Sequence, residues 1–272
     1  MPEKPEVVTV ANTLKKQIIG KKVTDCNVYW DNIIACPTVL EFRERIVGQK
    51  IYDISTRGKW LVFELDNDFL LIHLRMEGKF FFRDVDSVKN KHEHVIFTLD
   101  NEISFRFHDV RKFGKMYLLD KKEAYSKKPL CELGLEYNDV ELNVDYLYQK
   151  IHLKKLPIKT LLLDQSIITG IGNIYDDEIL FLSHISPLRR GEDITKVECE
   201  HIIFNTRKVL DEAIKMGGTT IKSFTSSEGV HGLFQNKLAI HGRTGDCFVC
   251  GGSIVKIKVG GRGTYYCPKC QK

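Results

Sequence analysis

The stretch CFVCGGSIVKIKVGGRGTYYCPKC, from Cys247 to Cys270, contains two CxxC pairs that are separated by sixteen residues. Pairs separated by roughly 15 to 20 residues are typical of zinc sites. Each pair places two thiolates on one tight turn, and two facing turns supply a closed tetrahedral shell that leaves no open position for catalysis. The sequence therefore predicts one structural zinc ion bound by Cys247, Cys250, Cys267 and Cys270.

The segment between the two pairs predicts a β-hairpin. From Val255 to Val259, apolar residues alternate with lysines, which is the pattern of a strand with one buried face. The following glycines indicate a sharp turn around Arg262, where a phosphate would be able to approach the backbone closely. The spacing alone is equally consistent with an arginine that is merely solvated in a turn.

Composition indicates a globular chain of more than one domain. It has 272 residues, of which 43% are hydrophobic and 28% charged, whereas one domain typically spans roughly 100 to 200 residues. No stretch approaches the roughly 18 uninterrupted apolar residues of a membrane span. Charged Glu3, Lys4 and Glu6 stand where a secretory signal needs a basic and then an apolar run. We therefore expect two domains in a cytoplasmic protein with no membrane partner.

The other four cysteines have no ligand spacing. In a reducing compartment, cysteines are thiols or metal ligands rather than disulfides. We expect each of the four to be a small buried residue without a chemical role: Cys26, Cys36, Cys131 and Cys199.

Positive charge is concentrated at the C-terminal end. The chain has a net charge of +5, and residues 217–272 contain eight Lys and Arg against two acidic residues, which is +6 there and −1 for the first 216 residues. A basic end can bind phosphate polymers. On charge alone, a solvated surface is an equally good interpretation.

Local patterns divide the chain into a strand-rich half and a helical half. A first helix is indicated by Pro5 near its start, apolar residues at helical spacing as far as Ile18, and Gly20 as its stop. Residues 50–119 form short runs rich in Val, Ile, Phe and Tyr, whereas apolar residues beyond residue 143 recur at steps of three and four. These patterns predict an α+β fold with a β-sandwich at 1–125, a linker at 126–143, a helical domain at 144–216, a loop at 217–240 and the zinc finger at 241–272.

The segment DQSIITGIGNIYDDEIL, from Asp164 to Leu180, has a further pattern. Gly170 and Gly172 interrupt one helix, and Asn173 is suited to cap the next. Exposed amides at such a helix start bind phosphate readily, and Lys159 lies shortly upstream. On this pattern alone, an ordinary helical hairpin is the better interpretation.

Over essentially its whole length, the chain resembles the formamidopyrimidine-DNA glycosylases. The matching motifs are MPEKPEV at 1–7, RGKW at 57–60, HLRMEGKF at 73–80, KHEHV at 91–95, DVRKFG at 109–114, the 164–180 segment, FQNKLAIHGRTG at 234–245 and GRGTYYCPKCQ at 261–271. Each motif is weak alone, but together and in this order they are highly specific. The resemblance implies an N-terminal β-sandwich and a helical domain with a helix-two-turns-helix motif and a zinc finger, with DNA in the cleft between them.

The resemblance also implies a set of catalytic residues. In this family the initiator methionine is removed and the exposed proline amine is the nucleophile, which is Pro2 here. An α-amino group with a pKa near 8 has a usable neutral fraction at pH 7, unlike a lysine with a pKa of about 10.4. The implied supporting roles are acid and base catalysis by Glu3, orientation by Glu6, assistance of β-elimination by Lys59 and of δ-elimination by Arg262. Without the resemblance, two glutamates beside an amino terminus are more simply partners of a helix dipole.

Other residues are implied to contact DNA, because a damaged nucleotide has to be flipped out of the duplex before it can react. Met76, Arg111 and Phe113 match the residues that fill the vacated space, with a thioether, a base-bonding arginine and an aromatic wedge. Phosphate contacts are implied for His92, Lys154, Lys159, Asn173 and Arg262, and DNA binding through the orphaned base for Arg111. Recognition of the flipped base is implied for Glu77, Thr219 and Ser223. Taken alone, Met76 and Phe113 would be core residues and the loop at 217–240 a plain linker.

The resemblance therefore predicts a bifunctional DNA glycosylase and abasic-site lyase that excises 8-oxoguanine and formamidopyrimidines through a Schiff base. We expect a monomeric, nucleoid-associated enzyme whose partner is double-stranded DNA with oxidised bases or abasic sites. One alternative is an endonuclease VIII type enzyme for oxidised pyrimidines, against which the intact trio Met76, Arg111 and Phe113 argues. Another is a non-catalytic zinc-dependent DNA-binding protein, against which the presence of Pro2, Glu3 and Lys59 together argues.

Two positions depart from the family pattern. The family usually has leucine where this chain has Lys4, which places an additional charge near the nucleophile. The usual LGPEP segment is LGLEY at 133–137. Because this segment falls in the predicted linker, we expect the second departure to matter little.

Overall fold

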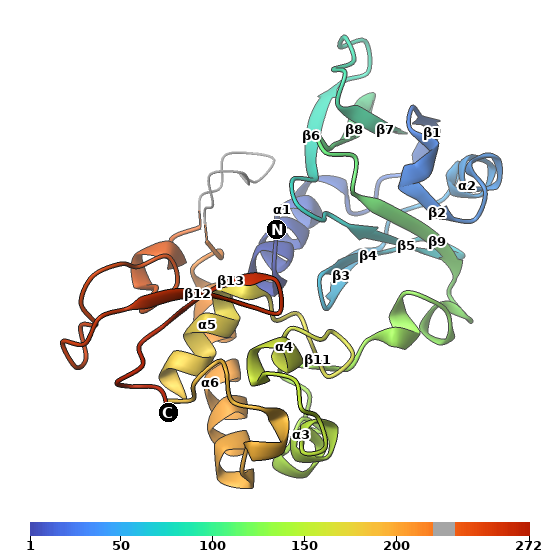
Figure 1. Ribbon diagram of the computed structural model, residues 1–272. Coiled ribbons are helices and arrows are strands. Elements are labelled where there is room, and N and C mark those ends of the chain that lie inside the picture. The colour runs from blue at the N-terminus through green and yellow to red at the C-terminus, as the bar shows by residue number, and fades with distance from the viewer. Residues whose placement is uncertain (220–231) are drawn as a thin grey trace. The chain divides into compact units, whose positions relative to one another are not determined.

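A computed structural model describes residues 1–219 and 232–272 (Figure 1). The chain forms two compact units, Met1–Cys131 with Gly217–Gly232, and Glu132–Met216 with Leu233–Lys272. The first consists mainly of strands and the second mainly of helices, which confirms the predicted α+β class. Ser223 of the predicted loop lies outside the described residues. Within 1–219 and 232–272, no helix has the length and apolar character needed to cross a membrane.

Two sheets form the predicted β-sandwich of the first unit. One is antiparallel, in the order β1 (Val23–Val28), β7 (Glu93–Leu99), β8 (Ile103–His108) and β6 (Lys79–Asp84). The other has the order β2 (Ile34–Cys36), β9 (Lys115–Asp120), β5 (Asp68–His73), β4 (Trp60–Glu64) and β3 (Asp53–Arg57), and only β2 and β9 are parallel. The ring of Phe63 in β4 lies 6.3 Å from that of Phe80 and 6.0 Å from that of Phe105, both in the other sheet. The inner faces therefore share one aromatic core.

Helices α1 (Lys4–Ile18) and α2 (Val39–Ile46) flank the sandwich (Figure 1). Helix α1 has Pro5 in its first turn and ends at Ile18, as predicted, and its apolar face, including Val7 and Leu14, belongs to the sandwich core. This packing fixes the amino-terminal end of the chain against β3 and β4. Short 3₁₀ helices lie at Asp31–Ile33, Ala124–Ser126 and Leu130–Glu132.

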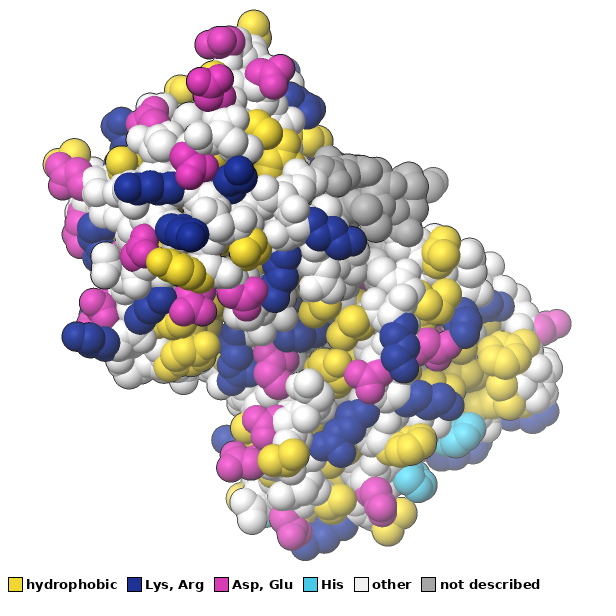
Figure 2. All heavy atoms as spheres, turned by 180° about the vertical axis from the view of Figure 1, so that it is seen from behind, with side chains coloured by type: hydrophobic (Ala, Val, Ile, Leu, Met, Phe, Trp, Pro, Cys, Tyr) yellow, Lys and Arg dark blue, Asp and Glu magenta, His cyan; other side chains and the backbone are white. Residues whose placement is uncertain are grey.

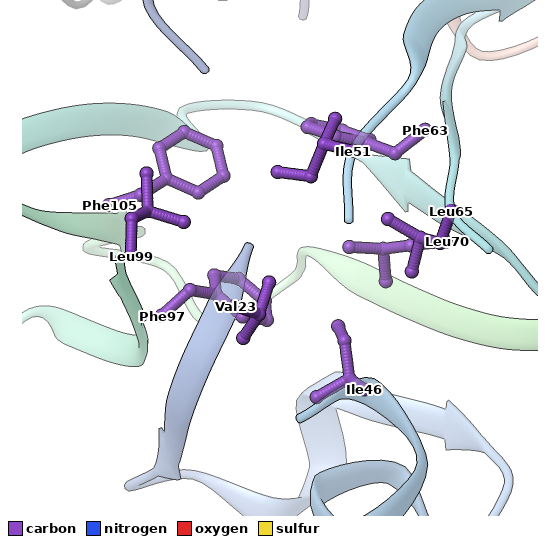
Figure 3. Close-up of a pocket in the computed structure, with 9 residues that line it drawn as sticks. All are labelled: Val23, Ile46, Ile51, Phe63, Leu65, Leu70, Phe97, Leu99 and Phe105. Carbon is purple, nitrogen blue, oxygen red and sulfur yellow. The ribbon is translucent and has the colours of Figure 1, made fainter. Parts of the chain in front are cut away.

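The sandwich core contains a small cavity between its sheets and α2. Figure 3 shows its apolar lining, which includes Val23, Ile46, Phe63 and Phe105. Its volume is about 10 Å³, close to the minimum for one water molecule, and a water needs polar partners that this lining does not offer. We therefore regard it as a packing void rather than a binding site.

The second unit combines helices with a small β-hairpin. Its helices are α3 (Val144–Ile151), α4 (Ile158–Leu162), α5 (Asn173–Leu182) and α6 (Lys196–Lys215), with 3₁₀ helices at Gly191–Asp193 and Phe234–Lys237. Helix α6 begins with a capping box between Thr195 and Glu198. The hairpin pairs β12 (Val255–Val259) with β13 (Arg262–Tyr266), so Arg262 is the first residue of a strand, and the turn consists of Gly260 and Gly261 at φ +55° and +80°.

The LGLEY segment is an ordered part of the second unit rather than a linker without structure. Leu135 and Glu136 form β10, which pairs in parallel with β11 (Ile168–Thr169). A Cβ atom on Gly134 would lie 2.4 Å from the carbonyl oxygen of Ile167, so only glycine fits there. The hydroxyl of buried Tyr137 donates to Asp211 Oδ1 at 2.8 Å, and its burial raises the pKa of this phenol. The departure from the family pattern therefore supplies a packing residue.

Candidate functional site

The amino-terminal segment is held by the carboxylate of Glu6. Glu6 Oε2 accepts the backbone N–H of Glu3 at 2.8 Å, and Glu6 Oε1 accepts the backbone N–H and the hydroxyl of Thr219 at 2.8 and 3.1 Å. Both glutamates are buried. A Cβ atom on Gly218 would lie 2.6 Å from Glu6 Oε1, so glycine permits this close approach. One buried carboxylate thus fixes the residues beside Pro2 and joins them to Thr219.

Lys59 lies in the tight turn between β3 and β4. Arg57 pairs with Trp60, which leaves Gly58, at φ +55°, and Lys59 as the two turn residues. Lys59 is buried. Lys4 at the start of α1 donates to Thr56 Oγ1 at 3.0 Å. The predicted catalytic residues Glu3, Glu6 and Lys59 therefore come from adjoining elements.

The segment from Leu74 to Gly78 is a compact turn that presents Met76 and Glu77. The N–H of Arg75 donates to His73 Nδ1 at 2.9 Å, and that of Gly78 donates to Leu74 O at 2.9 Å. Burial, aided by the charges of Arg75 and Lys59, lowers the pKa of His73 to about 3. The imidazole is therefore neutral and able to accept the hydrogen bond from the N–H of Arg75. Met76 and Glu77 are partly exposed, so neither is a core residue.

A second buried carboxylate organises the DVRKFG turn. Asp109 is fully buried, and it accepts the backbone N–H groups of Arg111 at 3.0 Å and of Phe113 and Gly114 at 2.8 Å each. Arg111 and Phe113 point outward, with the guanidinium 4.8 Å from the ring centroid. Phe113 is 49% exposed, which is unusual for a phenylalanine. Sequence reasoning missed Asp109, although an acidic residue before a polar turn is a recognisable turn signal.

His92 lies on a loop that is anchored by a buried ion pair. Arg106 Nη1 lies 3.1 Å from Glu93 Oε2, and the Arg106 guanidinium also donates to the carbonyl oxygens of Asp84 and Ser87. The Glu93 carboxylate accepts the N–H of Asn90 at 2.9 Å. Arg106 is 2% exposed. It positions the His92 loop, and no sequence motif identified it.

In the second unit, Asn173 contacts the zinc hairpin. Gly172 rather than Asn173 caps α5, which corrects the prediction. The Asn173 side chain is free for this contact because it starts the helix itself, and its Nδ2 donates to Gly263 O at 2.9 Å. Gly263 follows the exposed Arg262. This hydrogen bond, between residues ninety positions apart, brings Asn173 close to the strand that begins with Arg262.

The structure gives Lys159 a role other than the predicted phosphate contact. Its side chain is fully buried, and its ammonium is paired with Asp177 and lies 3.8 Å from Asp176 Oδ2. Asp177 Oδ2 also accepts the N–H of Tyr265 in β13 at 3.2 Å and lies 2.6 Å from His241 Nδ1. Lys159 therefore balances a buried carboxylate that holds the hairpin. Lys154, between α3 and α4, is only partly buried.

The four cysteines of the C-terminal module form a metal centre. Their Sγ atoms lie within 4.8 Å of one another, with 3.8 Å between Cys247 and Cys270 and 3.5 Å between Cys250 and Cys267. A tetrahedron with Zn–S bonds of about 2.3 Å has sulfur atoms about 3.8 Å apart. The residues thus fit one structural zinc ion, as predicted.

The remaining cysteines only partly match their prediction. Cys26 and Cys199 are buried, and burial raises the pKa of each thiol to about 12, so both are unreactive. Cys36 is only partly buried and Cys131 is exposed. The exposure of Cys131 contradicts the prediction, because this residue lies in a 3₁₀ turn at the edge of the first unit rather than under a packed face.

Charge is mixed on the surface that Figure 2 shows, where Lys and Arg side chains are interspersed with Asp and Glu on both units. This agrees with a net charge of only +5. Phosphate binding by this chain therefore depends on where individual cations are placed, rather than on the charge of the chain as a whole.

Known proteins match this chain over its whole length. Residues 1–116 match the family model of the formamidopyrimidine-DNA glycosylase N-terminal domain, residues 133–225 that of its H2TH domain, and residues 247–272 a zinc finger found in FPG and IleRS. A formamidopyrimidine-DNA glycosylase of Oceanobacillus iheyensis is 44% identical over 100% of this chain and 98% of its own length. Two structures of Lactococcus lactis Fpg, one with DNA containing an abasic site and one with DNA containing an oxidised pyrimidine, have TM-scores of 0.92 and 0.91 at 34% identity, with both chains covered completely.

Proposed function

The chain belongs to the formamidopyrimidine-DNA glycosylase family and is a DNA glycosylase of base excision repair, and from this premise we propose that it excises oxidised purines and then cleaves the strand. The observation that carries the proposal is the Glu6 carboxylate, which fixes Glu3 directly beside Pro2 and draws Thr219 to the same point. Such buried, hydrogen-bonded carboxylates beside an amino terminus suit acid and base chemistry at a sugar.

Pro2 supplies the nucleophile once Met1 has been removed. The lone pair of its neutral amine forms a bond to C1′ of the damaged nucleotide, and the bond from C1′ to the base breaks. The base leaves with that electron pair and takes up a proton. Loss of the amine proton and opening of the C1′–O4′ bond then give a cationic imine, which is the Schiff base. Covalent attack of this kind divides one difficult step into easier ones.

Glu3 is the acid that protonates O4′ as the sugar ring opens, and Glu6 orients it through the bond to its backbone N–H. Lys59 contributes a buried positive charge from the β3–β4 turn, which suits contact with the reacting nucleotide. Removal of a C2′ proton from the imine then expels the 3′ phosphate by β-elimination. A second elimination expels the 5′ phosphate, and there we assign a part to Arg262.

The flipped nucleotide leaves a space that Met76, Arg111 and Phe113 fill. The Asp109 turn supports this role, because three N–H groups bonded to one carboxylate hold Arg111 and Phe113 outward. Phe113 is then an exposed aromatic wedge and Arg111 an exposed donor for the orphaned base. Glu77 and Thr219 are the described candidates for recognition of the flipped base.

Phosphate contacts are assigned to His92, Lys154, Asn173 and Arg262, and contact with the orphaned base to Arg111. The hydrogen bond from Asn173 to Gly263 supports a joint role for Asn173 and Arg262. The zinc ion keeps the hairpin in shape and takes no part in the chemistry, because its four thiolate ligands leave no open position. A monomer in the cytoplasm, associated with the nucleoid, is the setting that we propose.

Borohydride trapping tests the function. A duplex with 8-oxoguanine opposite cytosine is incubated with the wild-type enzyme, with Pro2→Gly, and with Glu44→Gln as a control at an exposed position. We expect covalent adducts with the wild type and the control, and none with Pro2→Gly. An absent wild-type adduct, or an equal one with Pro2→Gly, would refute the mechanism. Faster excision of thymine glycol than of 8-oxoguanine would favour the oxidised-pyrimidine alternative.

A further inference from the structure

Lys4 is a buried cation two residues after the proposed nucleophile. It is the first residue of α1 and is 6% exposed, and its ammonium donates to Thr56 Oγ1 at 3.0 Å and to Thr56 O at 3.4 Å. Burial of a charged group is unfavourable, and a positive charge in the first turn of a helix opposes the helix dipole. An apolar side chain would fill this position without either penalty. A lysine here therefore points to a use for its charge.

The hydrogen bonds of Lys4 link the start of α1, which follows Pro2 and Glu3, to β3, the strand that leads to Lys59. Helix α1 packs against β3 and β4 (Figure 1). Thr56 lies in β3, two residues before Gly58 opens the turn that carries Lys59. The same side chain thus fixes the first turn of α1, which follows Pro2, against the strand that leads to Lys59. The position of the Lys4 ammonium is therefore set by β3 and not only by α1.

The segments that adjoin Lys4 carry further charged residues. Glu3 immediately precedes α1 and Glu6 lies in its first turn, Asp53 and Arg57 lie in β3, and Lys59 lies in the β3–β4 turn. Asp53 is paired with Lys15 at 2.7 Å, and Glu6 is bonded to Thr219. On β4, Glu64 is paired with Lys121 at 2.9 Å. Of the lysines and arginines in these segments, Lys4 is the one nearest to Pro2 in sequence.

We propose that Lys4 is a positioning residue for the Pro2 amine: it holds the first turn of α1 on β3, and its charge favours the neutral, nucleophilic form of that amine. A neighbouring positive charge disfavours protonation of an amine. The neutral fraction of Pro2 is then larger at a given pH below its pKa, and imine formation extends to lower pH. This inference rests on the proposed function, because it needs Pro2 to be the nucleophile.

Four variants separate charge from hydrogen bonding. Lys4→Arg keeps the charge, Lys4→Gln keeps a hydrogen-bond donor without the charge, and Lys4→Leu removes both. Thr56→Val keeps the lysine but removes its Oγ1 acceptor. The rate of imine formation is measured under single-turnover conditions by borohydride trapping on an abasic-site duplex from about pH 5 to 9, which brackets the pKa of about 8 of an α-amine. Binding of an uncleavable abasic analogue duplex is measured in parallel.

For Lys4→Gln and Lys4→Leu, we expect the acidic limb of the pH profile to move to higher pH by about 0.5 to 1.5 units, which is the shift for charges roughly 8 to 24 Å apart at an effective dielectric constant of about 20. At a fixed pH on that limb, trapping is then about 3-fold to 30-fold slower. Lys4→Arg should retain the wild-type limb, and Thr56→Val should lower the rate at every pH without moving the limb. Binding of the analogue should stay within about threefold.

Unshifted limbs in both Lys4→Gln and Lys4→Leu would overturn the proposal, as would a loss of rate in Lys4→Gln that is the same at every pH. Lys4→Leu also guards against misfolding, because an apolar residue suits this buried position. If the wild-type enzyme forms no adduct at any pH, the proposed function fails, and this inference fails with it. If the wild-type enzyme forms an adduct but the limbs of the Lys4 variants do not shift, only the role of Lys4 is contradicted.

Discussion

The two units hold their functional side chains by different means. In the first unit, the carboxylates of Glu6 and Asp109 accept backbone N–H groups from the segments that they position, and both sit against the large apolar core of the sandwich. In the second unit, the hairpin with Arg262 has a small core around Phe181 and Ile240, to which the cysteines themselves belong. The first arrangement needs only a folded sandwich, whereas the second depends on zinc. Chemistry and phosphate binding should therefore be separable by mutation.

The largest expected effect separates chemistry from binding in the first unit. Glu3→Gln removes the proposed acid but keeps the size of the side chain, so base excision should be slower by about 10²-fold to 10⁴-fold. Affinity for an abasic analogue duplex should change little, because phosphate contacts are assigned to other residues. Single-turnover excision and a binding titration measure the two quantities. Comparable losses in both would remove the separation that we propose, and Glu44→Gln serves as the exposed control.

Loss of zinc tests the metal dependence of the second unit. Cys247→Ser should abolish stoichiometric zinc and unfold the hairpin, because structural zinc contributes about 10 to 16 kcal/mol of binding free energy in small zinc modules. DNA affinity and β-elimination should then fall together, by about 100-fold if two phosphate contacts are lost. Metal analysis and a binding titration give the readouts. The matched control is Cys131→Ser, at an exposed cysteine outside the cluster, and unchanged DNA binding without zinc would contradict the structural role.

The Asp109 turn offers a more local test. Asp109→Ala leaves the N–H groups of Arg111, Phe113 and Gly114 without their acceptor, so the free energy of unfolding should fall by about 2 to 4 kcal/mol. Excision should decline as well, since Arg111 and Phe113 lose their fixed direction. Denaturant unfolding and excision assays measure both, with Asp86→Ala at an exposed position as the control. A variant as stable as the control would show that the turn does not need its carboxylate.

The last effect concerns the acid stability of the first unit. The pKa of His73 is lowered to about 3 in the folded protein, below its unfolded value of about 6.5. The unfolded chain therefore binds one more proton between these values, and stability is lost as the pH falls from 6.5 towards 3, by up to about 1.4 kcal/mol per pH unit. His73→Phe should lack this slope. Urea unfolding from about pH 4.5 to 7, which covers the upper part of this range, would show equal slopes for the wild type and His73→Phe if the prediction were wrong.

Much of the fold and of the metal centre could be predicted from the sequence. The cysteine spacing predicted a four-sulfur cluster because two CxxC turns offer few other arrangements, and the Sγ distances agree. The end of α1 at Ile18 followed from apolar spacing. Predictions failed where an exact helix boundary or a long-range contact decided the outcome. Asn173 does not cap α5 because the helix begins at Asn173 itself, one residue after the observed cap Gly172. Lys159 is buried, and Asp177 balances its charge there.

The sequence by itself determined the zinc ligands, the α+β class and, through its ordered motifs, the family and the set of candidate catalytic residues. These features depend on local spacing and residue type, which are visible along the chain. Only the tertiary structure showed that Glu6 joins Glu3 to Thr219, that Asp109 and Arg106 hold the turns of the first unit, and that Lys4 reaches Thr56. The physical reason is that a buried charge is stable only beside its partners, and those partners come from distant parts of the chain.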